Sequence, residues 1–107
     1  MNYRKNSKVL ETYLNENGVI RFNLNSPENL NALSENMMNS LQNALDKASI
    51  NKNVRVIIIS GEGSTFSSGH DLKELKAARK GADKGKKYFL KIMKKCSKMT
   101  QTIIKCP

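Results

Sequence analysis

The stretch VRVIIISGEGSTFSSGHDLKEL, residues 54–75, decides the fold. Its first part, Val54–Ser60, is a nearly continuous run of β-branched apolar residues, which is typical of a strand buried on both faces in a parallel sheet. The next part, Gly61–His70, is rich in glycine and serine and therefore predicts a loop. Asp71 can cap a helix over residues 72–79. The stretch thus predicts a strand, a loop and a helix in that order.

Two strands and a helix precede this stretch. Residues 9–14 predict a strand, and residues 19–25 predict a second one in which apolar and polar side chains alternate. The Asn-Gly pair between them predicts a hairpin, because both residue types tolerate positive φ. Residues 26–33 have the composition of a loop. Ser34 is a suitable N-cap for an amphipathic helix that reaches about Ile50. A strand, a helix and a further strand in this order form a βαβ unit, so the predicted fold class is α/β.

The last third of the chain carries its positive charge. Residues 1–72 hold seven Lys or Arg against seven Asp or Glu, whereas residues 73–107 hold twelve against two, which accounts for the net charge of +10. A longer helix is predicted here, with lysines on one face and apolar residues on the other: Tyr88, Phe89, Ile92, Met93, Cys96, Met99 and Ile103. Such a basic segment could bind nucleic acid, an anionic membrane or a phosphate-bearing ligand. We favour a solvated lysine face and expect no nucleic-acid partner, because no aromatic or arginine pattern accompanies the lysines.

The chain of 107 residues allows one domain or less, with a small core. Cys96 and Cys106 have neither disulfide-framework nor metal-site spacing, so we expect free thiols and no metal site. No apolar run approaches the ~20 residues of a membrane span. The N-terminal residues lack the apolar core of a secretory signal.

The only histidine, His70, stands close to Ser68 and Asp71, but a catalytic triad is rejected. A triad needs side chains that converge from separated chain positions, and neighbours in a turn diverge. The two glycines of GEGSTF, residues 61–66, match neither a dinucleotide fingerprint nor a Walker motif. A lone histidine also lacks partners for a metal site.

The backbone of Ser67–His70 offers a better candidate. It lies between the end of a strand and the start of a helix, which is where ligands bind in open α/β sheets. Backbone N–H groups at such a place can hold an anion or a developing oxyanion, and Gly69 would let the backbone approach a ligand closely. The alternative is an ordinary turn with Asp71 as the cap, and the residues alone do not decide between the two.

The segments SPENLNALSENMMNSLQNAL (26–45) and VRVIIISGEGSTFSSGHDLKEL (54–75) resemble, in order and spacing, the N-terminal signature of the enoyl-CoA hydratase/isomerase (crotonase) family. F-S-S-G-H-D-L is the most specific part and is similar to the hydratase-domain-containing subgroup. The resemblance covers about Val9 to Pro107. It implies the N-terminal portion of the crotonase (ClpP-like) ββα spiral, incomplete, with residues 1–8 as an N-terminal extension and residues 9–107 as a partial crotonase domain.

The resemblance also implies a binding site for a coenzyme A thioester, which is a substrate, with no covalently bound cofactor. In the family, the backbone N–H at the position of His70 is one of two oxyanion-hole donors. The residues that would line the CoA path here are Asn31, Ala32, Leu33, Ser68, Gly69, His70, Asp71 and Leu72. The stabilisation of an enolate oxygen by preorganised N–H groups fits this chemistry.

The family's second oxyanion donor and its acid/base carboxylates lie beyond residue 107, so we expect this chain alone to be inactive. We expect Glu74 to be solvated, and a strand edge beside Val54–Ser60 to be uncovered. The function implied for the full-length parent is enoyl-CoA hydratase/isomerase-type chemistry, in fatty-acid metabolism. Two alternatives stay open: an inactive acyl-CoA-binding homologue, and a basic module that uses residues 84–105 on nucleic acid or an anionic surface. The family implies a homotrimer or hexamer in a mitochondrial or cytoplasmic location.

Overall fold

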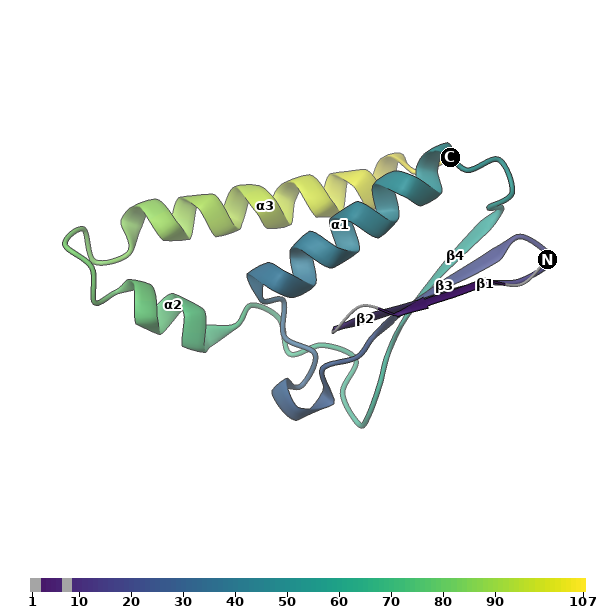
Figure 1. The fold of residues 1–107 in the computed structure, drawn as a ribbon. Coiled ribbons are helices and arrows are strands. Elements are labelled where there is room, and N and C mark those ends of the chain that lie inside the picture. The colour runs from purple at the N-terminus through teal and green to yellow at the C-terminus, as the bar shows by residue number, and fades with distance from the viewer. Residues whose placement is uncertain (1–2, 7–8) are drawn as a thin grey trace.

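A computed structural model describes residues 3–6 and 9–107. Four strands form one mixed sheet in the order β1-β2-β3-β4, and two helices cross one face of it (Figure 1). The strands are β1 (Tyr3–Asn6), β2 (Leu10–Leu14), β3 (Val19–Leu24) and β4 (Val56–Gly61). The β1–β2 and β2–β3 pairs are antiparallel, and the β3–β4 pair is parallel.

The sequence predicts every strand except β1. No element is predicted within the N-terminal extension, residues 1–8, yet residues 3–6 pair with β2. Residues 1, 2, 7 and 8 of that extension lie outside the described part of the chain. The predicted hairpin joins β2 to β3, but only Gly18 of the Asn-Gly pair has a positive φ, of 84°. The Asn15 side chain closes the turn by accepting hydrogen bonds from the N–H groups of Asn17 and Val19.

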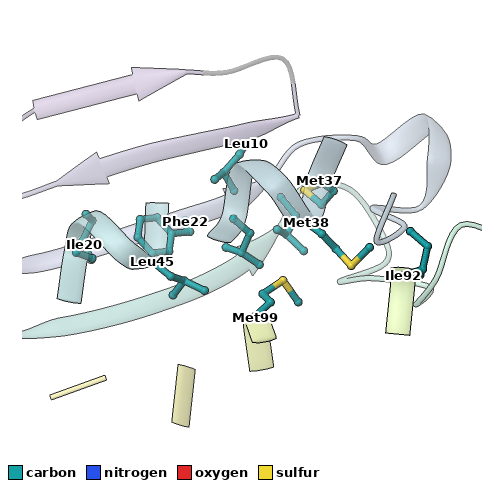
Figure 2. Packing of buried hydrophobic residues seen from close by; sticks show 11 residues of the cluster. Leu10, Ile20, Phe22, Met37, Met38, Leu45, Ile92 and Met99 are labelled. Carbon is teal, nitrogen blue, oxygen red and sulfur yellow. The ribbon is translucent and has the colours of Figure 1, made fainter. Parts of the chain in front are cut away.

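Helix α1 (Glu35–Ile50) packs its apolar stripe against the sheet. Ser34 caps it as predicted, because the Ser34 hydroxyl accepts a hydrogen bond from the N–H of Met37 at 3.1 Å. Figure 2 shows the core that results, in which β2, β3, α1 and α3 contribute side chains. The fully buried members with the largest side chains are Phe22, Leu24, Met37, Met38 and Leu45.

Strand β4 is not buried on both faces, so that prediction is wrong. Val56 is 51% exposed and Ile58 is 36% exposed, while Ile57 and Ile59 pack against the core from the other face. The reason is that the core lies against one face of the sheet, while Val56 and Ile58 point to the other face. β4 also pairs with β3 on one side only and forms the edge of the described sheet. The prediction of an uncovered edge at this strand is therefore confirmed. An apolar groove of about 420 Å³ lies beside it, lined in part by Ile57, Ile59 and Ile103.

Two further helices follow β4. The short helix α2 (Leu72–Ala78) begins at the predicted place, and α3 (Lys86–Lys105) runs alongside α1 (Figure 1). The predicted apolar face of α3 is buried at Ile92 and Met99, whereas Met93 and Ile103 remain 47% and 39% exposed. None of the described helices combines the length and the apolar character that crossing a membrane requires.

Candidate oxyanion loop and its supports

The candidate site is the loop between β4 and α2, which lies beside the segment that leads into α1. Two backbone hydrogen bonds join these segments: the N–H of Ser68 donates to the carbonyl of Leu30 at 3.0 Å, and the N–H of Leu33 donates to the carbonyl of Gly69 at 2.6 Å. Leu33 and His70 form a short parallel bridge there. The predicted binding residues 31–33 and 68–72 are thereby brought together, although they come from separate parts of the sequence.

His70 is half-buried at the end of this bridge. Among the hydrogen bonds of the described residues, none uses its backbone N–H. The pairing pattern explains this, because in the bridge the N–H of Leu33 donates to the carbonyl of Gly69 and the N–H of His70 takes no part. Gly69 adopts a φ of 93°, and a Cβ added to it would meet no atom beyond its chain neighbours within 4 Å, so the glycine serves the backbone turn rather than a close contact. The geometry leaves one N–H donor available to a ligand.

The His70 side chain contributes differently. Its Nδ1 atom is buried and has no hydrogen-bond partner among the described residues. A buried Nδ1 without an acceptor favours the tautomer that carries its proton on Nε2. The ring therefore has no partner to orient it as a general base, and the backbone remains the group of interest.

Asn31 is the most deeply fixed of the predicted binding residues, with no exposed surface. Its Nδ2 donates to the carbonyls of Glu62 and Thr65, each at 2.8 Å, and its Oδ1 accepts from the N–H of Ser26 at 2.8 Å. The side chain therefore holds the loop rather than facing outward. Ala32 is also buried, and Leu33 packs partly against the core.

Asp71 caps α2 as predicted. Its Oδ1 accepts hydrogen bonds from the N–H groups of Lys73 at 2.9 Å and Glu74 at 3.4 Å, and its Oδ2 accepts from the Asn29 side chain at 3.0 Å. Partial burial raises the pKa of Asp71, but these hydrogen bonds outweigh it and hold the pKa below its ordinary value. Leu72 begins the helix, two residues after His70, and is 74% exposed.

Glu74 is not a solvated residue, in contrast to the prediction. Its Oε1 accepts the N–H of Glu35 at 2.9 Å, which ties the start of α1 to α2 across 39 positions of sequence. Glu35 in turn lies 3.5 Å from the ammonium of Lys91, and a hydrogen bond from Tyr88 lowers the pKa of Glu35. Burial and the bond to Glu35 raise the pKa of the Tyr88 phenol. These side chains join α1, α2 and α3 behind the candidate loop.

The lysine face of α3 borders a groove of about 590 Å³ along α1. Its lining residues are Lys91, Lys94, Lys95 and Lys98 on one wall and Asn39, Gln42, Asn43 and Asp46 on the other. Lys95 donates to the Asn39 side chain at 2.7 Å. Within the described ranges, the Lys91–Glu35 contact is the one ion pair that this basic helix makes. Most of its positive charge is therefore solvated.

Sequence reasoning missed the supports of the loop. The local sequence pattern shows neither the hydrogen bonds of the Asn31 side chain nor that of the Glu74 carboxylate. Apart from Ser26, which is close to Asn31 in the sequence, their partners are 31 to 39 residues away. One signal was present: asparagine tolerates left-handed backbone better than most residues, and Asn31 has a φ of 53°.

Comparison with known proteins agrees with this architecture. Residues 14–105 match the model of the family described as enoyl-CoA hydratase/isomerase. The chain is 45% identical over 84 residues to enoyl-CoA hydratase domain-containing protein 3, mitochondrial, of Xenopus laevis, which covers 78% of this chain and 27% of that protein. The human protein of the same name is 40% identical over 86 residues, covering 80% and 27%.

The crystal structure of enoyl-CoA hydratase from Mycobacterium smegmatis superposes with a TM-score of 0.85 at 31% identity and covers 94% of this chain and 37% of that one. This superposition confirms the expected crotonase-type α/β fold. The chain spans a little over a quarter of the curated relatives above. On both sequence and structure, the chain belongs to the enoyl-CoA hydratase/isomerase family.

Proposed function

We propose that the loop of residues 68–72 binds the thioester group of an acyl-CoA, with the backbone N–H of His70 donating to the thioester carbonyl oxygen. The observation that carries this proposal is that N–H group, unpaired within the described part of the chain, on a loop whose Ser68 N–H and Gly69 carbonyl are hydrogen-bonded to the segment before α1. A hydrogen-bond donor fixed before the ligand arrives needs no reorganisation when charge develops on the oxygen.

For a family member with the length of the relatives above, we propose enoyl-CoA hydratase/isomerase-type chemistry. Such chemistry passes through an enolate, whose negative charge rests on the thioester oxygen. The N–H of His70 would stabilise that charge, and it is the one catalytic group that we assign to this chain. The family resemblance implies a second oxyanion donor and acid/base carboxylates outside these 107 residues.

A second candidate is binding of acyl-CoA without turnover. It is favoured by the state of the carboxylates near the loop. Asp71 is engaged as a helix cap, and Glu74 accepts a backbone N–H of α1. Carboxylates that are held in this way are poorly placed to exchange protons with a substrate. A hydration assay of this chain with crotonyl-CoA is expected to show no turnover, and clear turnover would contradict binding without turnover and the expectation that this chain alone is inactive.

The third candidate, a basic module for nucleic acid or an anionic surface, rests on the solvated lysines that border the α1–α3 groove. It predicts RNA or vesicle binding that weakens steeply with salt. Binding that is weak and shows little salt dependence would leave the lysines as a solvated face.

We extend to this chain the mitochondrial location that the names of the frog and human relatives carry. An import assay with isolated mitochondria and a fluorescent fusion of the full-length gene product tests it, and exclusion from the organelle would overturn it. The trimer or hexamer implied by the family remains a prediction for the full-length protein.

The thioester proposal is tested by titrating the ¹⁵N-labelled chain with butyryl-CoA, a saturated thioester, and in parallel with free CoA. We expect the amide proton of His70 to move downfield with the thioester and far less with free CoA, because free CoA has no thioester carbonyl. The amides of Ser68 and Leu72 are expected to respond to both ligands. No response of the His70 amide to either ligand would refute the proposal.

A His70→Ala variant separates the backbone from the side chain. The substitution keeps the N–H at position 70 and removes the imidazole. We expect the amide of position 70 still to move downfield with butyryl-CoA. Loss of the response would show that the imidazole, rather than the backbone, contacts the thioester.

A further inference from the structure

The segment that supports the oxyanion loop has an unusual backbone. Leu30 and Asn31 both adopt left-handed conformations, with φ of 52° and 53°. Such a conformation is unfavourable for a residue with a side chain, because its Cβ approaches the following carbonyl oxygen. Two strained residues in succession persist only where the surroundings fix them, and strain of this kind gathers at functional sites.

The Asn31 side chain provides that fixation. It reaches the start of the loop through the carbonyls of Glu62 and Thr65, and it reaches its own segment through the N–H of Ser26. The carbonyl of Asn31 accepts a hydrogen bond from the hydroxyl of Ser67, later in the loop, at 2.8 Å. One buried residue therefore contacts the loop at Glu62, Thr65 and Ser67.

The loop is also shaped around this amide. A methyl group added at Gly61 would lie 2.5 Å from the carbonyl oxygen of Phe66 and 3.0 Å from Nδ2 of Asn31. Gly61 thus leaves the space in which the Asn31 amide sits. The hydroxyl of Ser67 continues the contact, because it accepts the N–H of Gly69 at 3.2 Å, one residue before His70.

We propose that Asn31 is a positioning residue that sets the direction of the His70 N–H. The inference rests on the thioester-binding proposal above. Asn31 does not touch the ligand, since its side chain has no exposed surface. It acts through two hydrogen bonds in series. The Asn31 carbonyl accepts from the Ser67 hydroxyl, and that hydroxyl accepts from the N–H of Gly69, the neighbour of His70. Without this support the donor would sample several directions, and its interaction with the carbonyl would weaken.

The test uses the 107-residue chain and two variants of different severity. Asn31→Asp keeps the shape and the Oδ1 acceptor but replaces the two donated hydrogen bonds with repulsion between oxygens. Ser67→Ala is milder, because it removes only the hydroxyl that links Asn31 to Gly69, and Ser67→Thr restores a hydroxyl. Asn36→Asp, at an exposed position near the start of α1, is the control for the added charge.

Two quantities are measured for each folded variant. The first is the ratio of the Kd of free CoA to the Kd of butyryl-CoA, which reports the contribution of the butyryl thioester, its acyl chain included. The second is the infrared stretching frequency of the bound, ¹³C-labelled thioester carbonyl, which falls as the carbonyl becomes polarised. We expect Asn31→Asp and Ser67→Ala to reduce the ratio roughly five- to tenfold, since a net hydrogen bond contributes about 1 kcal/mol. The carbonyl frequency is expected to return towards that of the ligand in water.

The outcomes separate this inference from the proposal on which it rests. If the wild-type chain neither prefers the thioester nor shifts its carbonyl frequency, the thioester proposal itself fails. If the wild-type chain does both, and Ser67→Ala and Asn31→Asp do so equally, Asn31 is a structural residue only and the inference is wrong. Loss in Ser67→Ala with recovery in Ser67→Thr, and no change in Asn36→Asp, would support it.

Discussion

Replacement of Asp71 by alanine tests the account of how α2 and the loop are held. The substitution removes an N-cap that serves two backbone N–H groups, and it removes the acceptor of the Asn29 amide. Loss of an N-cap costs about 1 kcal/mol of stability, and loss of the hydrogen bond to the Asn29 side chain costs about 1 kcal/mol more. We therefore expect the free energy of unfolding to fall by about 1–2 kcal/mol, a large share for a domain of this size.

Urea unfolding followed by far-ultraviolet circular dichroism measures this loss. Asp46→Ala is the matched control, because Asp46 is an exposed aspartate that accepts a hydrogen bond from Gln42 within α1 and caps no helix. We expect that control to change the free energy by less than about 0.5 kcal/mol. If Asp71→Ala and Asp46→Ala had equal small effects, the cap would not stabilise the structure as described.

The same site predicts a pH dependence with a definite sign. The folded-state pKa of Asp71 lies below the ordinary value of 3.8, so the folded state binds fewer protons than the unfolded state. The contribution of Asp71 is therefore complete above that ordinary pKa and is lost as the pH falls through the folded pKa. Asp71→Asn keeps a capping oxygen but cannot titrate, so the stability difference from wild type is expected to shrink between about pH 5 and pH 2. A difference that stays constant over this range would contradict the assignment.

Three further predictions concern the core, the helix junction and the open strand. Phe22→Ala is expected to lower the free energy of unfolding in urea by about 3–5 kcal/mol, because Phe22 is buried. Val56→Ala is expected to lower it by less than about 1 kcal/mol, because Val56 is half exposed. Equal losses would contradict the placement of the core. Glu35→Gln is expected to lower the pKa of Tyr88 towards its ordinary value, measured by NMR of a ¹³C-labelled tyrosine ring, and an unchanged pKa would argue against their hydrogen bond. Ile58→Lys is expected to reduce self-association in light scattering without loss of the fold, because a lysine on an exposed edge strand opposes strand pairing; unchanged association would point to another surface.

The sequence alone predicts much of this fold because the signals are local. The turn at Gly18, the caps at Ser34 and Asp71, and the spacing of apolar residues in α1 each act within a few residues of chain. The burial of β4 was misjudged because β-branched composition shows that a strand is apolar, whereas its burial depends on what lies against it.

The candidate site was predictable in its position and less so in its construction. The order of strand, loop and helix places the backbone of His70 at the end of a strand, and the family resemblance adds the thioester. The roles of Asn31 and Glu74 depend on partners more than thirty residues away, which no local pattern encodes. A polar residue near a ligand loop suggests a binding role, although here the Asn31 side chain is enclosed.

The His70 N–H has no hydrogen-bond partner among the described residues, and we propose that a thioester carbonyl accepts it. Amide hydrogen exchange of the ¹⁵N-labelled chain tests it directly, with Ser68 and Leu33 as internal references because their N–H groups are hydrogen-bonded. We predict that the His70 amide exchanges much faster than either reference amide without ligand, and that saturating butyryl-CoA slows its exchange. Protection of His70 equal to that of Ser68 in the unliganded chain, or no slowing by the thioester, would contradict it.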